Sequence, residues 1–283
     1  MIPDNTHIKS VDLKVRDLNK SLYFYSYLLG FYEKRISEFE AELLTNPGNH
    51  YLIKLIEDKA AIFPERNNTG LFHIAMRFPG RKELARIFIR LFEQKQKFRG
   101  FSDHLVSEAI YLSDPDGNGI ELYADKPRSE WKWNDGQIEM DTLPLDLSII
   151  TKELDDKEIW NGIHPETDIG HIHLKVSKLV FADMFYNRIL GFNISSNLYP
   201  GALFLAANGY HHHIGANVWQ SRNGTTPPEN SLGLLSFAIK IPDKNYISQL
   251  EKTLEIENLL IQKSDDGSLL VKDFDNIKIR LTL

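Results

Sequence analysis

The stretch I-H-L-K-V-S-K-L at residues 172–179 decides the fold, because V-D-L-K-V-R-D-L at residues 11–18 repeats its pattern. Both stretches are followed, at the same distance, by Phe-Tyr and then by Leu-Gly-Phe, which ends at Phe31 and Phe192. Each copy is typical of a strand, a turn and an amphipathic helix that stops at a glycine. An internal repeat of this kind predicts a chain built from similar modules.

Two weaker copies of the pattern occur in the same chain. They are L-F-H-I-A-M-R-F at residues 71–78 and L-L-S-F-A-I-K-I at residues 234–241. Their predicted helices cover residues 81–94 and 244–254. Both copies close alike, with D-P-D-G-N-G-I-E-L at residues 114–122 and D-F-D-N-I-K-I-R-L at residues 273–281. The sequence therefore predicts an α+β fold made of four βαβββ modules.

The modules divide the chain into two pairs with a linker between them. Their predicted limits are residues 1–66, 67–125, 169–222 and 232–283. In chain order these form one pair over residues 1–125 and another over residues 169–283. Residues 126–168 are polar, contain Trp131 and Trp133, and show a short helical pattern near residues 145–154. Their charge and length predict a connection whose tryptophans pack back on the sheets.

Composition limits the classes of function. The 283 residues are 42% hydrophobic, which is enough to bury the cores of about two domains. A net charge of −6, with no long basic block, argues against nucleic acid or an anionic membrane as a partner. The absence of cysteine excludes disulfides and thiolate chemistry. No signal segment or membrane-spanning run is found, so we expect a cytoplasmic protein, for which a homo-oligomer is compatible with the sequence.

Three consecutive histidines stand in Y-H-H-H-I-G-A-N-V-W at residues 210–219, which we interpret as a strand. Alternation would place His211, His213 and Gly215 on one face. His212 would then lie on the opposite face, where we expect a structural role.

An upstream strand predicted at residues 170–176 likewise presents His171, His173 and Lys175 on one face. Imidazole is a versatile ligand for transition metals, so the histidines of the two strands predict a metal-binding cup. The alternative is a tract of partly exposed histidines at a sheet edge.

The pattern V-x-D-L-x-x-S-x-x-F-Y-x-x-x-L-G-F at residues 15–31, its second copy, and D-P-D-G-N-G-I-E-L-Y at residues 114–123 resemble the vicinal-oxygen-chelate superfamily. That group includes glyoxalase I, fosfomycin-resistance proteins and type I extradiol dioxygenases. A closer likeness is to the catechol-2,3-dioxygenase proteins of bacilli. It rests on D-H-x-V-S-E-A at residues 103–109, G-H-I-H-L at residues 170–174 and G-Y-H-H-H-I-G at residues 209–215.

The resemblance implies a cup made by two modules, with metal ligands on the first and last strand of each. Copy two has His73 and Glu121 at these positions, and copy three has His171 and His213. The outer copies have lost every ligand. Pairing module two with three, and one with four, would give one complete cup and one degenerate cup, an arrangement similar to that of single-chain, four-module glyoxalases. The degenerate cup would be lined by Ser10, Ser236 and Arg280.

Three imidazoles and one carboxylate suit Fe(II), Mn(II), Ni(II) or Zn(II), and the resemblance favours Fe(II). It implies an extradiol dioxygenase that cleaves catechol-like aromatic diols with O2 in aromatic compound degradation. His173 or His211 would act as the base. Typical extradiol enzymes keep their metal ligands in the C-terminal half, where Ser236 and Arg280 break the pattern here.

Two other classes of function stay open. One is a metal-dependent isomerase or lyase of the glyoxalase type, which four protein ligands would suit. The other is a non-catalytic protein that binds a small molecule, as resistance proteins do. His104 is a candidate for a second-shell or substrate-binding residue, with a turn-capping role as the alternative.

Overall fold

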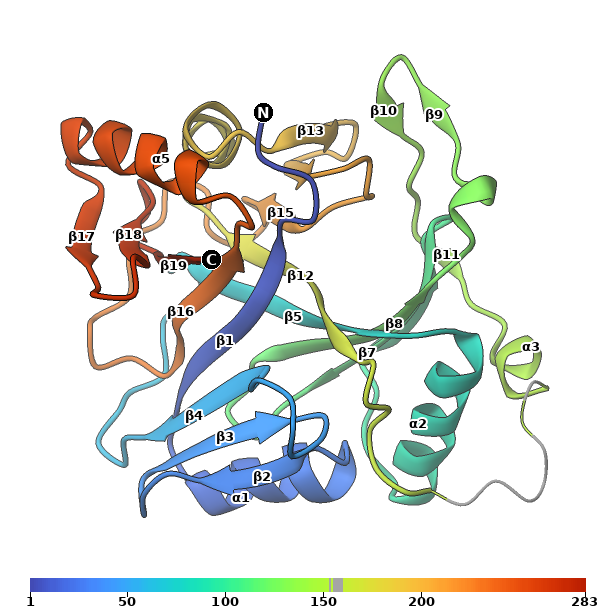
Figure 1. The fold of residues 1–283 in the computed structure, drawn as a ribbon. Coiled ribbons are helices and arrows are strands. Elements are labelled where there is room, and N and C mark those ends of the chain that lie inside the picture. The colour runs from blue at the N-terminus through green and yellow to red at the C-terminus, as the bar shows by residue number, and fades with distance from the viewer. Residues whose placement is uncertain (153, 155–159) are drawn as a thin grey trace. The chain divides into compact units, whose positions relative to one another are not determined.

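The computed structural model describes residues 1–152, 154 and 160–283, which form two compact units (Figure 1). Unit 1 contains Met1–Lys14, Ala60–Phe72 and Gly170–Leu283. Unit 2 contains Val15–Lys59 and His73–Ile169. Both units combine helices with β-sheets, which confirms the predicted α+β class. The predicted module limits, the linker and the pairing of modules into cups stay predictions.

One group of strands in unit 1 joins the first strands of sequence copies one and four. In hydrogen-bonded order the strands are β17 (Leu260–Lys263), β18 (Leu269–Lys272), β19 (Lys278–Thr282), β16 (Gly233–Lys240) and β1 (His7–Val15). β1 runs antiparallel to β16, and β16 runs parallel to β19. Phe237 and Ile239 of β16 are both buried. They lie on the same face of the sheet, because alternate residues of a strand share a face. Helix α5 (Lys244–Ile256) buries Ile247, Leu250 and Leu254.

The second group of strands in unit 1 carries the histidines. In hydrogen-bonded order the strands are β12 (Asp168–Lys175), β15 (Ile214–Asn217), β14 (Ala202–Ala206) and β13 (Asn193–Ser196). β12 and β15 are parallel, as expected for the first and last strands of one module. The helix between β12 and β13 begins as α4 (Leu179–Ala182) and continues as a π-helical segment, η3 (Asp183–Ile189).

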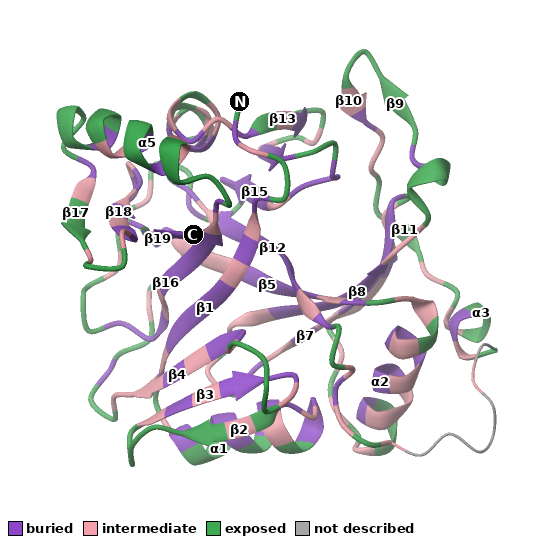
Figure 2. Ribbon diagram, in the orientation of Figure 1, coloured by how far each residue is buried: buried purple, intermediate pink, exposed green. Residues whose placement is uncertain are grey.

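Unit 2 repeats these arrangements. One group of strands is β11 (Leu143–Pro144), β6 (Gly100–Asp103), β7 (Ser107–Ser113), β8 (Gly119–Asp125) and β5 (Gly70–Phe78); another is β4 (Ile53–Glu57), β3 (Glu40–Leu44) and β2 (Tyr32–Arg35). Its helices include α1 (Leu18–Leu22), the π-helical η1 (Tyr23–Leu28) and α2 (Arg81–Glu93). Most strand residues are buried, whereas the helices keep an exposed side (Figure 2). None of the helices in the described ranges is long and apolar enough to cross a bilayer.

The region predicted as a linker has short elements of its own. They are η2 (Arg128–Glu130), the hairpin of β9 (Trp133–Asn134) and β10 (Gln137–Ile138), and α3 (Leu147–Thr151). Trp131 is buried and its Nε1 donates to the Lys126 carbonyl oxygen at 3.1 Å, as expected of a tryptophan packed on the fold. Trp133 is 42% exposed, so the expectation that both tryptophans pack back on the sheets is wrong for Trp133. Part of the predicted helix at residues 145–154, residue 153, lies outside the described residues.

Each unit contains one copy of the same buried tyrosine–aspartate contact. In unit 2 the Tyr25 hydroxyl donates to Asp114 Oδ2 at 3.0 Å, and in unit 1 the Tyr186 hydroxyl donates to Asp273 Oδ2, also at 3.0 Å. The tyrosines belong to the π-helical segments, and each aspartate begins the turn before a module's last strand. The contact therefore ties a module's helix to a strand that is remote in the sequence.

Of the two aspartates in these tyrosine–aspartate contacts, Asp273 is the clearer pH-sensitive group. Burial raises the pKa of Asp273 to about 7 from the ordinary 3.8, and the neighbouring Asp275 carboxylate adds to the rise. Hydrogen bonds from the Ile277 and Asp275 backbone amides and from the Tyr186 hydroxyl lower the pKa and oppose this rise. The folded protein therefore keeps a proton that the unfolded chain releases. With respect to this group, stability is greatest below about pH 4 and falls as the pH rises through about 7.

We predict that Asp273→Asn removes this fall, because the neutral amide has no proton to lose. Urea denaturation between pH 4 and 8 should show the variant gaining stability relative to the wild type as the pH rises. Asp265→Asn, at an exposed aspartate, is the matched control and should leave the pH profile unchanged. Parallel profiles for Asp273→Asn and the wild type would contradict the assignment.

Candidate functional site

A buried imidazole and carboxylate meet in unit 2. His73 lies on β5 and Glu121 on β8, and the parallel register pairs His73 with Gly119 and Ala75 with Glu121. Since residues two apart in a strand share a face, His73 and Glu121 project to the same side. The His73 Nε2 atom is 2.9 Å from Glu121 Oε2, and both residues are buried.

The turn before β8 fixes this register. Asp114 Oδ1 accepts hydrogen bonds from the backbone N–H groups of Asp116 and Asn118 at 3.0 and 2.8 Å. This is the Asx-turn chemistry predicted from the D-P-D-G-N-G motif. Burial raises the pKa of Asp114. Asp114 thus stabilises the turn, and Glu121, seven residues later, lies beside His73.

A tyrosine–histidine pair lies beside His73 and Glu121. Tyr111 on β7 stands opposite Glu121 in the antiparallel ladder, and its ring centroid is 5.9 Å from that of His73. The Tyr111 hydroxyl is 2.6 Å from His104 Nε2, and His104 Nδ1 is 2.7 Å from the Asp141 carbonyl oxygen. Because a carbonyl oxygen only accepts, Nδ1 carries a hydrogen, and in the neutral ring Nε2 accepts from Tyr111. His104 thus positions Tyr111, a residue that the sequence analysis missed.

In unit 1, His171 on β12 lies against the histidines that precede β15. Its ring centroid is 4.0 Å from that of His212 and 6.1 Å from that of His211. The Nδ1 atoms of His211 and His212 are 2.8 Å apart, so one of them donates to the other. We call these three residues the histidine cluster, and all of them are buried.

The predicted strand at residues 210–219 is wrong in its first half. β15 begins only at Ile214, and Asn208 and Gly209 take positive φ values of 51° and 60° in the turn after β14. The histidines follow that turn as irregular backbone, so strand alternation does not apply to them. His212 was expected on the opposite face from His211, and it instead contacts both His211 and His171.

His213 has a different environment from the histidine cluster. Its Nδ1 accepts a hydrogen bond from the Ala207 backbone N–H at 3.2 Å, and its ring lies 4.9 Å from that of Tyr210. The register of β12 and β15 pairs His173 with Gly215, so Gly215 occupies the place that Glu121 has in unit 2. The assignment of His213 as a metal ligand stays a prediction.

His173 is held in an aromatic enclosure. The ring centroids of Phe72, Phe204 and Trp219 lie 5.1, 5.7 and 5.6 Å from that of His173. A Cβ atom on Gly215 would be 2.9 Å from His173 Cγ, so only glycine leaves room for the ring there. Further along β12, burial lowers the pKa of Lys175. The predicted face of His171, His173 and Lys175 therefore has two buried histidines and a half-buried lysine, with aromatic rings around His173.

The buried residues include the donors that a divalent transition metal prefers. His73 and Glu121 in unit 2, and His171 in unit 1, each offer a side-chain atom of a type that can bind a metal ion. A set of two histidines and one glutamate fits Fe(II), Mn(II), Ni(II) or Zn(II) and leaves coordination positions for other molecules. The chemistry of the donor set thus fits the expected cofactor class.

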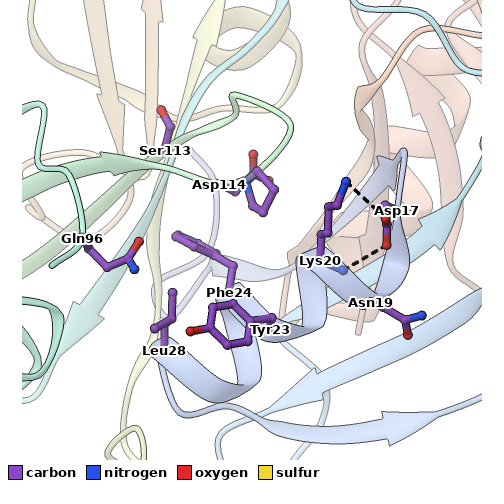
Figure 3. Close-up of a pocket in the computed structure, with 10 residues that line it drawn as sticks. Asp17, Asn19, Lys20, Tyr23, Phe24, Leu28, Gln96, Ser113 and Asp114 are labelled. Carbon is purple, nitrogen blue, oxygen red and sulfur yellow. Dashed lines mark hydrogen bonds and ion pairs between the residues drawn. The ribbon is translucent and has the colours of Figure 1, made fainter. Parts of the chain in front are cut away.

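Unit 2 also has a surface pocket of about 580 Å³ beside its π-helical segment (Figure 3). Tyr23, Phe24 and Leu28 line one part, and Asp17 and Lys20 form a hydrogen-bonded pair at the rim. None of the predicted site residues lines this pocket.

Comparison with known proteins agrees with this fold. A family model for the Glyoxalase/Bleomycin resistance protein/Dioxygenase superfamily matches residues 7–122. A protein of Bacillus subtilis (strain 168) named catechol-2,3-dioxygenase is 42% identical over 276 residues, which cover 96% of this chain and 95% of that protein.

Solved structures share the fold at low identity. Glyoxalase I from Zea mays has a TM-score of 0.59 at 14% identity, over 98% of this chain and 92% of that one. The cppA protein from Streptococcus pneumoniae TIGR4 has a TM-score of 0.63 at 12% identity, over 98% and 99% of the two chains. With a relative of this identity over nearly its whole length, the chain belongs to the Glyoxalase/Bleomycin resistance protein/Dioxygenase superfamily.

Proposed function

We propose that the protein is a metal-dependent extradiol dioxygenase, which opens the ring of a catechol-like diol with O2. The observation that carries the proposal is the buried His73–Glu121 pair flanked by the hydrogen-bonded Tyr111–His104 pair. Metal donors and a proton-handling pair on neighbouring strands are what oxidative cleavage of a diol needs. The name of the Bacillus subtilis relative supports the same activity.

In this proposal His73, Glu121 and His171 bind Fe(II), with His213 as the predicted fourth ligand. The chemistry of these buried residues supports the assignment, because imidazole nitrogens and carboxylate oxygens are ligands that Fe(II) takes in proteins. A bound ion of this kind would supply a Lewis acid and a template for the diol and oxygen. Mn(II), Ni(II) and Zn(II) suit the same donors, so the metal is a matter for measurement.

The remaining residues would handle protons and exclude water. Tyr111 can take a proton from a substrate hydroxyl as its own hydroxyl hydrogen passes to His104 Nε2, and the Asp141 carbonyl oxygen would hold the resulting imidazolium through Nδ1–H. His173 and His211 are the proposed bases for the diol. The rings around His173 would keep water from the base and give an aromatic substrate an apolar wall.

Glu121→Gln and His171→Ala should each abolish ring cleavage while the protein stays folded. Replacing a residue that hydrogen-bonds to a metal ligand typically costs about 10–100-fold in metal affinity or activity, so loss of a ligand itself should cost at least about 100-fold. Metal content after anaerobic purification, the yellow ring-opened product from catechol, and circular dichroism are the measurements.

His164→Ala, at a half-buried histidine whose Nδ1 accepts from the Glu166 backbone N–H, is the matched control and should retain activity. Full activity in Glu121→Gln or His171→Ala would reject the proposed ligands. A protein that binds metal, leaves catechol intact and converts a glyoxalase substrate would reject the dioxygenase in favour of an isomerase.

Tyr111→Phe should lower kcat by roughly 100-fold without changing the metal content, because general acid–base groups contribute about 10²–10⁴. His104→Asn should give a similar loss. If the two residues act as one unit, the double variant should be no slower than the slower single variant. Losses that multiply in the double variant would show that the pair does not act together.

Gly215→Ala should displace the His173 ring, since the added methyl would lie 2.9 Å from its Cγ atom. Overpacking of this kind costs about 1–3 kcal/mol of unfolding free energy. We expect a lower kcat at every pH, measured with catechol, together with a lower melting temperature. Gly100→Ala is the control, because a Cβ there meets nothing within 4 Å. Unchanged kcat and stability in Gly215→Ala would contradict the packing argument.

A further inference from the structure

A second polar face lies on the β17-β18-β19-β16-β1 strands of unit 1. The pairing of Asp12 with Ser236, and of Ala238 with Arg280, places these residues on one face of the sheet. The intervening Phe237 is buried on the opposite face. The face that carries Asp12, Ser236 and Arg280 also includes Ala238 and Leu270, whereas Phe237 and Ile279 are buried on the opposite face.

The two positions that carry metal donors in unit 2 have changed their chemistry on this face. In unit 2, Glu121 pairs with Ala75, two residues after His73. In unit 1, Arg280 pairs with Ala238, two residues after Ser236. Serine thus replaces the imidazole and a guanidinium replaces the carboxylate. A fixed positive charge would repel a metal ion and attract an anion.

The Arg280 guanidinium forms an ion pair with Asp12. Asp12 Oδ2 accepts a hydrogen bond from the Ser236 hydroxyl at 2.9 Å and lies 3.6 Å from Arg280 Nη2. Asp12 is buried, while the Arg280 side chain remains 40% exposed. One carboxylate therefore orients the guanidinium from one side, and an accessible part of it remains for another molecule.

Charge and an unpartnered hydroxyl on the same face point to a ligand. Thr282, two residues beyond Arg280 on β19, is 8% exposed, and its Oγ1 has no hydrogen-bond partner among the residues that the structure describes. A buried hydroxyl without a partner is costly unless a bound molecule supplies one. The register adds positive charge on this face, at Lys240 beside Thr282 and at Lys278 beside Lys272.

We propose that this face is a second, metal-independent binding site for a small molecule with an oxyanion, either a carboxylate or a phosphate. Arg280 would donate to the anion through its planar guanidinium, and Thr282 would add its hydroxyl. Asp12 competes with the ligand for the guanidinium while holding it in position. The site uses none of the residues proposed for metal binding.

The test is isothermal titration of the full chain with benzoate and, separately, with inorganic phosphate. Arg280→Met should weaken binding about 10-fold or more, because hydrogen bonds to charged groups are the strong ones. Thr282→Val should weaken it less, and Asp12→Asn should strengthen it by freeing the guanidinium. Lys252→Met, which removes an exposed cation from helix α5, is the matched control and should change affinity by less than about 2-fold.

Binding should also survive EDTA and Glu121→Gln. Tighter binding of benzoate would identify an organic acid as the ligand class, and tighter binding of phosphate would identify a phosphate ester. The proposal is overturned if neither anion binds saturably, if Arg280→Met and Asp12→Asn both bind like the wild type, or if chelation of metal abolishes binding. If Arg280→Met fails to fold, Asp12→Asn tests the proposal alone: tighter anion binding supports it, and unchanged or weaker binding overturns it.

Discussion

Parallel pairing between the first and last strand of a module is the constraint on which both polar faces depend. This pairing fixes which residue of the last strand lies beside each residue of the first strand. In β5 and β8 this register brings His73 to 2.9 Å from Glu121. In β16 and β19 the equivalent register brings Ser236 and Arg280 to the same carboxylate of Asp12. One backbone register thus places an imidazole and a carboxylate together in unit 2 and a hydroxyl and a guanidinium together in unit 1, and the side chains alone set the charge of each face.

The features that were predictable from the sequence are those that recur or alternate locally. Helices α2 and α5 begin where the amphipathic pattern begins, at Arg81 and Lys244. The D-P-D-G-N-G turn could be interpreted because aspartates and glycines impose a known backbone geometry, and it carries Glu121 into β8. The family resemblance implied metal ligands on the first and last strand of a module, and comparison of the repeats assigned His73 and Glu121 to these positions, an assignment that stays a prediction.

The features that could not be predicted depend on the register between neighbouring strands and on the position of a turn. Tyr111 faces Glu121 only through the register of β7 with β8, which periodicity within one strand cannot supply. The run His211–His213 was treated as a strand because β-type alternation follows it directly, but the turn at Asn208 and Gly209 delays the strand to Ile214. The role of Gly215 could not be predicted for the same reason, because this glycine leaves space for the His173 ring on the neighbouring strand β12.

The antiparallel pairing of β1 with β16 has a consequence for how the chain is made. His7 pairs with Lys240 and Lys14 with Gly233, so the N-terminal strand has no partner on that side until most of the polypeptide has left the ribosome. A nascent chain must therefore carry an open strand edge through nearly all of its synthesis, when such edges are prone to associate wrongly. The large sequence separation between β1 and β16 also favours slow folding, because the entropy of closing so long a loop is lost before this pairing stabilises the chain.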